Sequence, residues 1–422
     1  MKIKKMFIFA VLFAVLAVMP LWAVDKMTFS HDRKLPVYKC GEKAVLTLSA
    51  WEKGKLVSSG EYKVEFLFCG KKSIKTVPVD FSKGNPVKLE CTLNEPGFVL
   101  MRVRDKNNGS FQVNKKTILA GAAFEPEKIR KSYDMPADFM AFWENNRRLL
   151  EKEELKLVEN KKFSTDQYIA YNISLKSFND HVISGYLTIP RKKGKYPAFV
   201  TVPGAGPGIS SPSGYAKMNV ITLAVNVLNF PTADNSAEQK ARYIQYAKGV
   251  AYSHRGAGNR DTYFFRNVYS AIDRMINYVA SLEEFDGKHM VIDGSSQGGG
   301  SALILAGLNK NITALAANVP ALCDHGGYKA GRAPGWPNLA SRPDVDKFAP
   351  YFDAANFASL IKVPAFVSCG FIDTTCSPSS VYAAFNELKG EKEMYHMPLE
   401  GHTVTGGYSR AKSAFVKKHL GI

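Results

Sequence analysis

Residues 289–306 restrict the possible fold more than any other segment, because a short apolar strand there is followed directly by a glycine-flanked serine. They read His-Met-Val-Ile-Asp-Gly-Ser-Ser-Gln-Gly-Gly-Gly-Ser-Ala-Leu-Ile-Leu-Ala, which is a strand, a G-x-S-x-G turn and an Ala/Leu-rich helix. A serine at the tip of so sharp a turn is strained, and glycines such as Gly294 and Gly298 avoid clashes beside it. The pattern predicts that Ser296 stands exposed at a helix N-terminus, as in a nucleophile elbow, whereas Ser295 lacks this register.

A serine hydroxyl at such a turn reacts only if a base takes its proton and a carboxylate holds that base. In folds with this elbow the chain order is serine, acid, histidine. His402 lies in a Gly-flanked loop after the strand-like run 393–397, and we predict it as the base, with His325 in reserve. Asp373 follows an apolar strand and a glycine turn, and we predict it as the acid.

The other histidines and carboxylates in this part of the chain have simpler explanations. His396 falls within a strand and His419 within the last helix. Three aspartates in loops or before a helix fit solvated or capping roles, namely Asp344, Asp346 and Asp353.

Two backbone amides are candidates for an oxyanion hole. The N-H of Gln297 sits at the start of the predicted helix, where the helix dipole also favours negative charge. The second donor is expected in the turn after an earlier strand, and residues 198–208 supply a strand followed by Pro-Gly-Ala-Gly-Pro-Gly. Glycines let the backbone approach a carbonyl oxygen closely, so we predict the N-H of Ala205.

The second part of the chain has the pattern of a mostly parallel sheet covered by helices. Apolar strand-like runs alternate there with longer amphipathic stretches, at residues 182–189, 198–202, 220–227, 290–293 and 365–368. The segment 136–143 places Phe139, Phe142 and Trp143 on one helical face. We predict an α/β-hydrolase catalytic domain over residues 121–422.

The first part has period-two patterns instead. Residues 44–49, 62–68, 87–93 and 98–103 alternate between apolar and polar and are separated by Gly, Pro and Asn. Short strands at this spacing predict a small Ig-like β-sandwich over residues 24–120. No group of residues in it looks catalytic, which favours a stabilising or positioning module over a carbohydrate-binding one.

The first 23 residues have the build of a secretory signal peptide. They combine a basic head, an apolar run over residues 6–18 and a small residue at Ala23. The apolar run is shorter than the roughly 20 residues that a spanning helix needs, so we expect cleavage and no stable membrane span. The sequence therefore predicts an exported protein, periplasmic or secreted.

Charge and cysteine content set few further limits. The formal charge of +18 comes from scattered basic residues without a nucleic-acid motif, so we predict no nucleic-acid partner. The six cysteines show no C-x-x-C spacing, and we expect mostly buried free thiols with Cys69 and Cys91 as the one plausible disulfide. The predicted serine chemistry needs neither a metal nor a cofactor.

From about residue 136 to the end, the chain resembles the acetyl xylan esterase and cephalosporin C deacetylase family. Residues 294–300 (Gly-Ser-Ser-Gln-Gly-Gly-Gly) are similar to the family's GGSQGGG, and residues 254–266 to its RG-x-x-D-x-x-TYYYR stretch. Residues 370–386 resemble the acid motif, and residues 401–402 (Gly-His) occupy the histidine position. The resemblance implies the triad Ser296, Asp373 and His402, with Gln297 and Ala205 as oxyanion donors.

Three departures from the family pattern leave the reaction class intact and the substrate open. The HGY turn reads Pro-Gly-Ala at residues 203–205, the RGQ motif is replaced near residues 227–229, and the HE pair is His402-Thr403. The resemblance implies removal of acetyl groups from acetylated xylan-type sugars or oligosaccharides. Hydrolysis of another small acyl ester, and a catalytically dead carbohydrate-binding scaffold, stay as alternatives. Family members tend to form oligomers, which leaves a homo-oligomer open.

Overall fold

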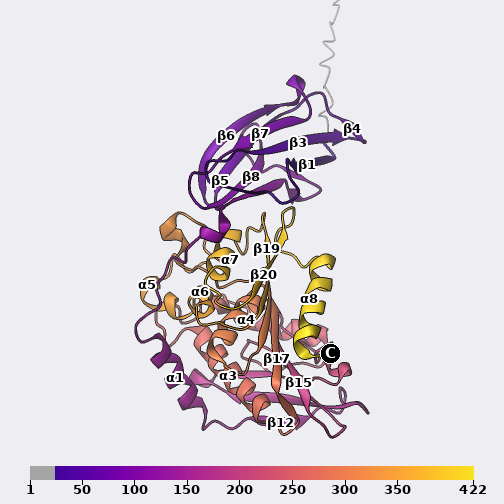
Figure 1. Cartoon of the computed structure of the whole chain (residues 1–422), viewed down its shortest axis with the longest axis vertical. Coiled ribbons are helices and arrows are strands. Elements are labelled where there is room, and N and C mark those ends of the chain that lie inside the picture. The colour runs from indigo at the N-terminus through magenta and orange to yellow at the C-terminus, as the bar shows by residue number, and fades with distance from the viewer. Residues whose placement is uncertain (1–23) are drawn as a thin grey trace, which may run out of the picture.

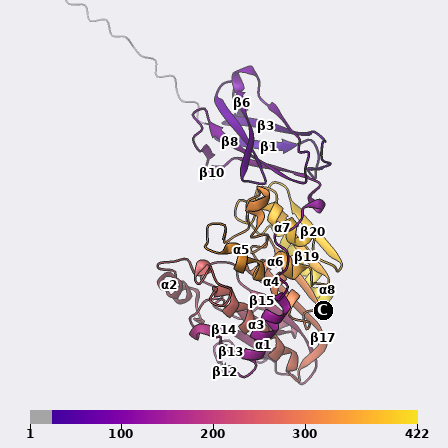
Figure 2. The same cartoon turned by 90° about the vertical axis from the view of Figure 1, so that its left-hand side faces the viewer.

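The computed structural model describes residues 24–422, so the predicted signal peptide, residues 1–23, lies outside the described residues. The described chain forms an all-β part, residues 24–124, and a larger part in which helices flank a sheet, residues 125–422. We call them the N-terminal module and the α/β region. The module is the indigo and purple part at one end of the molecule in Figure 1, and Figure 2 shows the same arrangement from the side.

Two sheets build the N-terminal module. The first has the order β1-β3-β4, with β7 also paired to β3, and the second has the order β2-β11-β8-β5-β6. Their strands are β1 (Lys26–His31), β2 (Val37–Tyr38), β3 (Ala44–Glu52), β4 (Lys55–Leu56), β5 (Glu61–Phe68), β6 (Lys72–Asp80), β7 (Val87–Cys91), β8 (Gly97–Asp105) and β11 (Leu119–Phe124), beside a small pair β9 (Gln112–Val113) and β10 (Lys116–Thr117). Along β3 every second residue from Ala44 to Ala50 is fully buried, because alternate side chains of a strand face one side of a sheet.

The end of the module differs in detail from the expected boundary after residue 120. Strand β11 runs Leu119–Phe124 and pairs antiparallel with β8 from Leu119↔Arg102 to Phe124↔Gly97. The expected boundary therefore falls inside a strand. Local sequence pattern did not show this, because the partner strand lies some twenty residues earlier in the chain.

All six cysteines are free thiols, so the disulfide suggested between Cys69 and Cys91 is wrong. Cys69 follows β5 in the second sheet of the module, whereas Cys91 ends β7 in the first sheet and pairs with Ala44. The expectation of mostly buried thiols is confirmed, since only Cys40 is partly exposed.

A nine-stranded mixed sheet forms the centre of the α/β region, in the order β12-β13-β14-β16-β15-β17-β18-β19-β20. The first three neighbouring pairs are antiparallel, and from β16 to β20 all pairs are parallel. The strands are β12 (Lys156–Glu159), β13 (Tyr168–Lys176), β14 (Val182–Pro190), β15 (Tyr196–Val202), β16 (Ile221–Val225), β17 (Phe285–Ser295), β18 (Ala314–Asn318), β19 (Ala365–Gly370) and β20 (Lys392–Met397). The predicted fold class, a mostly parallel sheet with flanking helices, is confirmed.

Helices cover both faces of this sheet. They are α1 (Phe139–Leu150), α2 (Ser236–Tyr246), α3 (Phe264–Ser281), α4 (Gln297–Leu308), α5 (Val345–Phe348), α6 (Ala354–Ala358), α7 (Pro378–Phe385) and α8 (Gly406–Leu420). Figure 1 shows α8 on one face and α3, α4 and α6 on the other. Under α8 lies a separate apolar cluster that includes Phe199, Val291 and Tyr408. Central strands are therefore buried on both sides, which explains their continuous apolar runs.

The helix expected from residues 136–143 is α1, and it buries Phe139, Phe142 and Trp143 as predicted. These aromatic side chains pack against aromatic residues of the segment 351–357, and Trp143 Nε1 donates a hydrogen bond to the Tyr351 carbonyl. Within residues 24–422, no helix has the length and apolar character needed to cross a bilayer.

Candidate active site

Ser296 lies at a sharp turn between β17 and α4. Its φ of 57° and ψ of −120° are strained for a residue with a side chain. A Cβ on Gly294 would collide with the Gly298 backbone, and a Cβ on Gly298 would collide with the Val202 carbonyl. The two glycines are therefore required by close backbone approach, as the G-x-S-x-G spacing predicts. The turn holds the Ser296 hydroxyl beyond the carboxyl end of β17.

The structure brings the three predicted triad residues together from three loops. His402 Nε2 lies 2.8 Å from Ser296 Oγ, and His402 Nδ1 lies 2.8 Å from Asp373 Oδ2. An ionised carboxylate can only accept, so Nδ1 carries the hydrogen and Nε2 is free to accept from the serine hydroxyl. This is the tautomer that a general base needs.

Burial and backbone contacts fix the acid more firmly than the histidine. The Asp373 side chain is 0% exposed, while that of His402 is 28% exposed. Asp373 Oδ1 accepts hydrogen bonds from the backbone N-H groups of Thr375 and Cys376, at 2.8 and 2.9 Å. Because one oxygen is held by backbone, the other is presented to the imidazole in a fixed direction.

The two predicted oxyanion donors flank the elbow. Gln297 is the first residue of α4 and is fully buried. Ala205 is exposed in the turn after β15. A Cβ on its neighbour Gly204 would lie 3.3 Å from the Ser295 carbonyl and 3.8 Å from the Ser296 Cβ, so this turn lies directly against the elbow.

His325, the reserve base, is not part of this arrangement. Its side chain is fully buried, and neither ring nitrogen has a hydrogen-bond partner in the part of the chain that the structure describes. Burial lowers the pKa of His325 to about 3, so the ring is neutral. It cannot serve as a base for Ser296, whose hydroxyl faces His402 instead.

The aspartates set aside as structural have structural contacts. Asp353 caps α6 by accepting from the Ala355 N-H. Asp346 accepts from the hydroxyls of Tyr133 and Tyr328, and Asp344 pairs with a neighbouring lysine. Within residues 24–422, no group of three or more His, Cys, Asp or Glu side chains is placed to hold a metal ion.

Residues 125–328 and 342–420 match the acetyl xylan esterase family, AXE1. The chain belongs to this family. An acetyl esterase of Xylanibacter ruminicola, Axe7A, is 34% identical over 343 residues, which cover 78% of this chain and 76% of the relative. This member of the acetyl xylan esterase family is accordingly a carbohydrate esterase, a hydrolase of carboxylic esters.

Two solved structures share the fold of the α/β region. An acetyl xylan esterase from Paenibacillus sp. R4 is 23% identical, with a TM-score of 0.58, and the match covers 70% of this chain and 99% of that one. Acetyl xylan esterase 1 from Thermoanaerobacterium sp. JW/SL YS485 is 20% identical, with the same TM-score, over 70% of this chain and 97% of that one. The likeness confirms the predicted α/β-hydrolase fold.

A buried tyrosine that the sequence analysis missed connects the two sides of the predicted oxyanion hole. The Tyr252 hydroxyl donates to Gln297 Oε1 at 2.7 Å, and Gln297 Nε2 donates to the Pro203 carbonyl at 3.4 Å. Burial raises the pKa of Tyr252, so the hydroxyl stays protonated and able to donate. No spacing rule points to this residue, because it lies in a short 3-10 helix, Tyr252–His254, far from the elbow in sequence.

A second residue that the sequence analysis missed is Asn318, at the end of β18. It contacts Thr403, the residue that replaces the glutamate of the family's HE pair. Its Nδ2 donates to Ser295 Oγ at 2.8 Å and to the Thr403 carbonyl at 3.2 Å, and its Oδ1 accepts from Ser368 at 2.6 Å. Asn318 thus ties the elbow strand to the loop that carries His402. In this family member the residue after the histidine contributes its backbone carbonyl to that tie.

Proposed function

We propose that this chain is an exported serine carbohydrate esterase that removes acetyl groups from acetylated xylan or xylo-oligosaccharides through an acyl-enzyme. The observation that carries the proposal is the hydrogen-bonded series from Ser296 Oγ through His402 to Asp373, with both distances at 2.8 Å. In this proposal an Ig-like β-sandwich, the N-terminal module, precedes an α/β-hydrolase catalytic domain.

The first half of the reaction forms the acyl-enzyme. Ser296 Oγ attacks the ester carbonyl carbon while His402 Nε2 takes the hydroxyl proton. Asp373 orients the imidazole and stabilises its positive charge without accepting the proton. When the tetrahedral intermediate collapses, the bond to the sugar oxygen breaks, and His402 returns the proton to that oxygen. The deacetylated sugar then leaves.

Water completes the cycle in the second half. His402 takes a proton from a water molecule, whose oxygen attacks the acetyl carbonyl carbon held on Ser296. The bond to Ser296 Oγ breaks, the serine regains its proton from the imidazolium, and acetate leaves. The negative oxygen formed in both halves faces the backbone N-H groups of Gln297 and Ala205, at the N-terminus of α4.

Substrate class and export rest on different support. The name of the Xylanibacter ruminicola relative describes an acetyl esterase, and the family is named for acetyl xylan. Export is supported by the basic head, apolar run and small residue of the first 23 residues. An exported enzyme would meet plant polysaccharide fragments outside the cytoplasm.

Acetate release from acetylated xylo-oligosaccharides tests the proposal. The wild-type protein should release acetate, and Ser296→Ala should lose at least about 10⁴-fold in rate, because removal of a triad member has effects of this order. Ser270→Ala, which changes a buried serine on α3, is a matched control and should keep the wild-type rate. Glycan binding by a wild-type protein that hydrolyses no ester would contradict the proposal and favour the dead scaffold.

A further inference from the structure

The N-terminal module packs directly against the loop that carries Asp373. The ring of Phe98, at the start of β8, meets the ring of Phe371 edge to face at a centroid distance of 5.2 Å and an angle of 81°. Both side chains are 1% exposed. On β11, a Cβ at Gly121 would lie 2.5 Å from the Phe371 carbonyl oxygen, so the strand backbone itself touches this residue.

Phe371 in turn links the acid loop to the histidine loop. It lies two residues before Asp373, and its N-H donates to the Met397 carbonyl at 3.2 Å. The next residue, Ile372, donates to the Glu400 carbonyl at 3.3 Å, two residues before His402. A displacement of Phe371 would therefore move the carboxylate and would disturb both hydrogen bonds to the histidine loop.

The module also bounds the space behind the carboxylate. A cavity of about 40 Å³ lies between the two parts of the chain. Gly70, Phe98 and Leu100 of the module form one wall, and the opposite wall includes Asp373 and Ser377 of the acid loop. The buried state of Asp373 thus depends on side chains that belong to the module.

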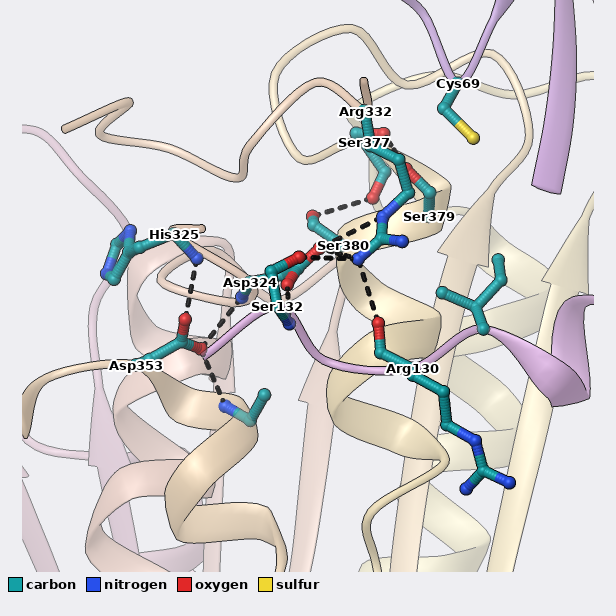
Figure 3. Close-up of polar contacts among 12 residues, drawn as sticks. Cys69, Arg130, Ser132, Asp324, His325, Arg332, Asp353, Ser377, Ser379 and Ser380 are labelled. Carbon is teal, nitrogen blue, oxygen red and sulfur yellow. Dashed lines mark hydrogen bonds and ion pairs between the residues drawn. The ribbon is translucent and has the colours of Figure 1, made fainter. Parts of the chain in front are cut away.

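A polar network beside this contact ties residues 130–132, which follow the module, to Arg332 and Asp324, and Figure 3 shows it. The Arg332 guanidinium forms an ion pair with Asp324 at 2.7 Å, with side chains 11% and 0% exposed. The same guanidinium donates to the Arg130 carbonyl and to Ser132 Oγ, both at 2.8 Å. The Ala333 N-H donates to the Cys69 carbonyl of the module at 3.1 Å.

We propose that the N-terminal module positions the catalytic acid, with Phe98 and Phe371 as positioning residues, and is more than a stabilising attachment. The proposal rests on the proposed role of Asp373. The family model matches from residue 125 onward, so the module lies outside the part that the model describes. The match to the Xylanibacter ruminicola relative covers 78% of this chain and so includes part of the module. A catalytic group that is displaced by about 1 Å can cost on the order of 10²-fold in rate. Substrate contacts would be spared, so the loss should fall on kcat.

Full-length variants of two phenylalanines separate positioning from stability. Phe98→Ala removes the ring that meets Phe371, and Phe98→Leu restores part of the apolar volume. Phe81→Ala is the matched control, because Phe81 is as buried as Phe98 and packs on Tyr62. Tyr62 pairs with Asp105, the last residue of β8, whereas Phe98 lies at the start of that strand. All are assayed for acetate release below their unfolding temperatures, with folding checked by circular dichroism.

We expect Phe98→Ala to lower kcat by roughly 10-fold to 100-fold with KM within about twofold, and Phe98→Leu to recover part of the loss. Phe81→Ala should keep the wild-type kcat. The rate at which a fluorophosphonate labels Ser296 should fall in Phe98→Ala by a similar factor. Wild-type kcat in Phe98→Ala, or an equal loss in Phe81→Ala, would overturn the positioning role.

A second variant covers the case in which Phe98→Ala does not fold. Gly121→Ala adds one methyl group against the Phe371 carbonyl and should also lower kcat more than KM, whereas unchanged kcat would count against the proposal. Failure of the proposed function has a different signature. In that case the wild-type protein would release no acetate and Ser296 would resist labelling.

Discussion

The α/β region holds two aspartate and histidine pairs whose aspartates are equally buried but differ in what their oxygens contact. Asp373 and Asp353 are 2% and 1% exposed, and both accept hydrogen bonds from backbone N-H groups. Asp373 keeps Oδ2 for the imidazole of His402. Asp353 uses Oδ1 for the Asp324 and Ala355 N-H groups and Oδ2 for the His325 N-H, as Figure 3 shows.

The two histidines also differ, both in exposure and in the partners of their ring nitrogens. His402 is partly exposed and has a partner on each ring nitrogen, whereas the His325 ring is buried and has neither within the described chain. A buried carboxylate therefore supports chemistry only when it leaves an oxygen for an imidazole that still reaches the substrate. When backbone groups take both oxygens, the aspartate fastens loops together.

Replacing each aspartate by asparagine should affect activity in one pair and stability in the other. Asp373→Asn should lower kcat by on the order of 10³-fold to 10⁴-fold, because the amide can no longer hold the imidazole in the required tautomer. Asp353→Asn places an NH₂ group where N-H donors point, so it should lower the free energy of unfolding by about 1–3 kcal/mol. Its kcat should stay within about threefold of wild type.

Steady-state kinetics and urea unfolding of the two variants supply the measurements. A loss of kcat in Asp353→Asn as large as in Asp373→Asn would show that the two pairs are not functionally distinct.

The pH dependence of stability sharpens the same comparison. Burial, and then the charge of Asp324, raises the pKa of Asp353 to about 7. A carboxyl whose folded-state pKa is raised adds stability that is present below its unfolded pKa, near 4, and is lost as pH rises through about 7. Between pH 5 and pH 8, the wild-type unfolding free energy should fall by about 2–3 kcal/mol relative to Asp353→Asn.

Urea titrations of both proteins at several pH values measure this difference. A difference that does not change with pH would contradict the raised pKa. The nearby His325 does not disturb the test, because burial lowers its pKa to about 3 and keeps the imidazole neutral over this range.

The smallest expected effect concerns a hydroxyl one contact away from the elbow. Tyr252→Phe removes the hydrogen bond to Gln297 Oε1 and leaves the ring in place. We expect kcat to fall by about 5-fold, because one neutral hydrogen bond contributes roughly 1 kcal/mol and the predicted oxyanion turn loses a support. Tyr186→Phe, at another buried tyrosine whose hydroxyl bonds to Ala233 and Asp234, is the control and should keep wild-type kinetics.

The parts of the site that could be predicted from sequence are those set by local geometry. Gly294 and Gly298 mark the elbow, because only glycine fits the close backbone contacts there. The placements of Asp373 and His402 follow from strand ends, since parallel strands bring their carboxyl ends to one edge of a sheet. The sheet and its helices could be predicted as well, because the apolar runs that mark them are local patterns in the sequence.

The contacts that sequence reasoning missed join segments with no common pattern. Tyr252 meets Gln297 across 45 residues, and Phe98 meets Phe371 across the two parts of the chain. Placement after a strand end favours Asp373 over Asp353, but which carboxylate oxygen stays free for an imidazole depends on contacts that no spacing encodes. The boundary expected after residue 120 falls inside β11, because that strand pairs with an earlier one.

Mass mapping of the protein after reaction with a fluorophosphonate tests the central claim most directly. An activated serine is expected to form a stable phosphonyl adduct, so the peptide that contains Ser296 should gain the probe mass in the wild-type protein. Ser296→Ala should gain none, and Asp373→Asn should react far more slowly. An adduct on another serine, or an unlabelled Ser296 in a protein that still releases acetate, would contradict the account.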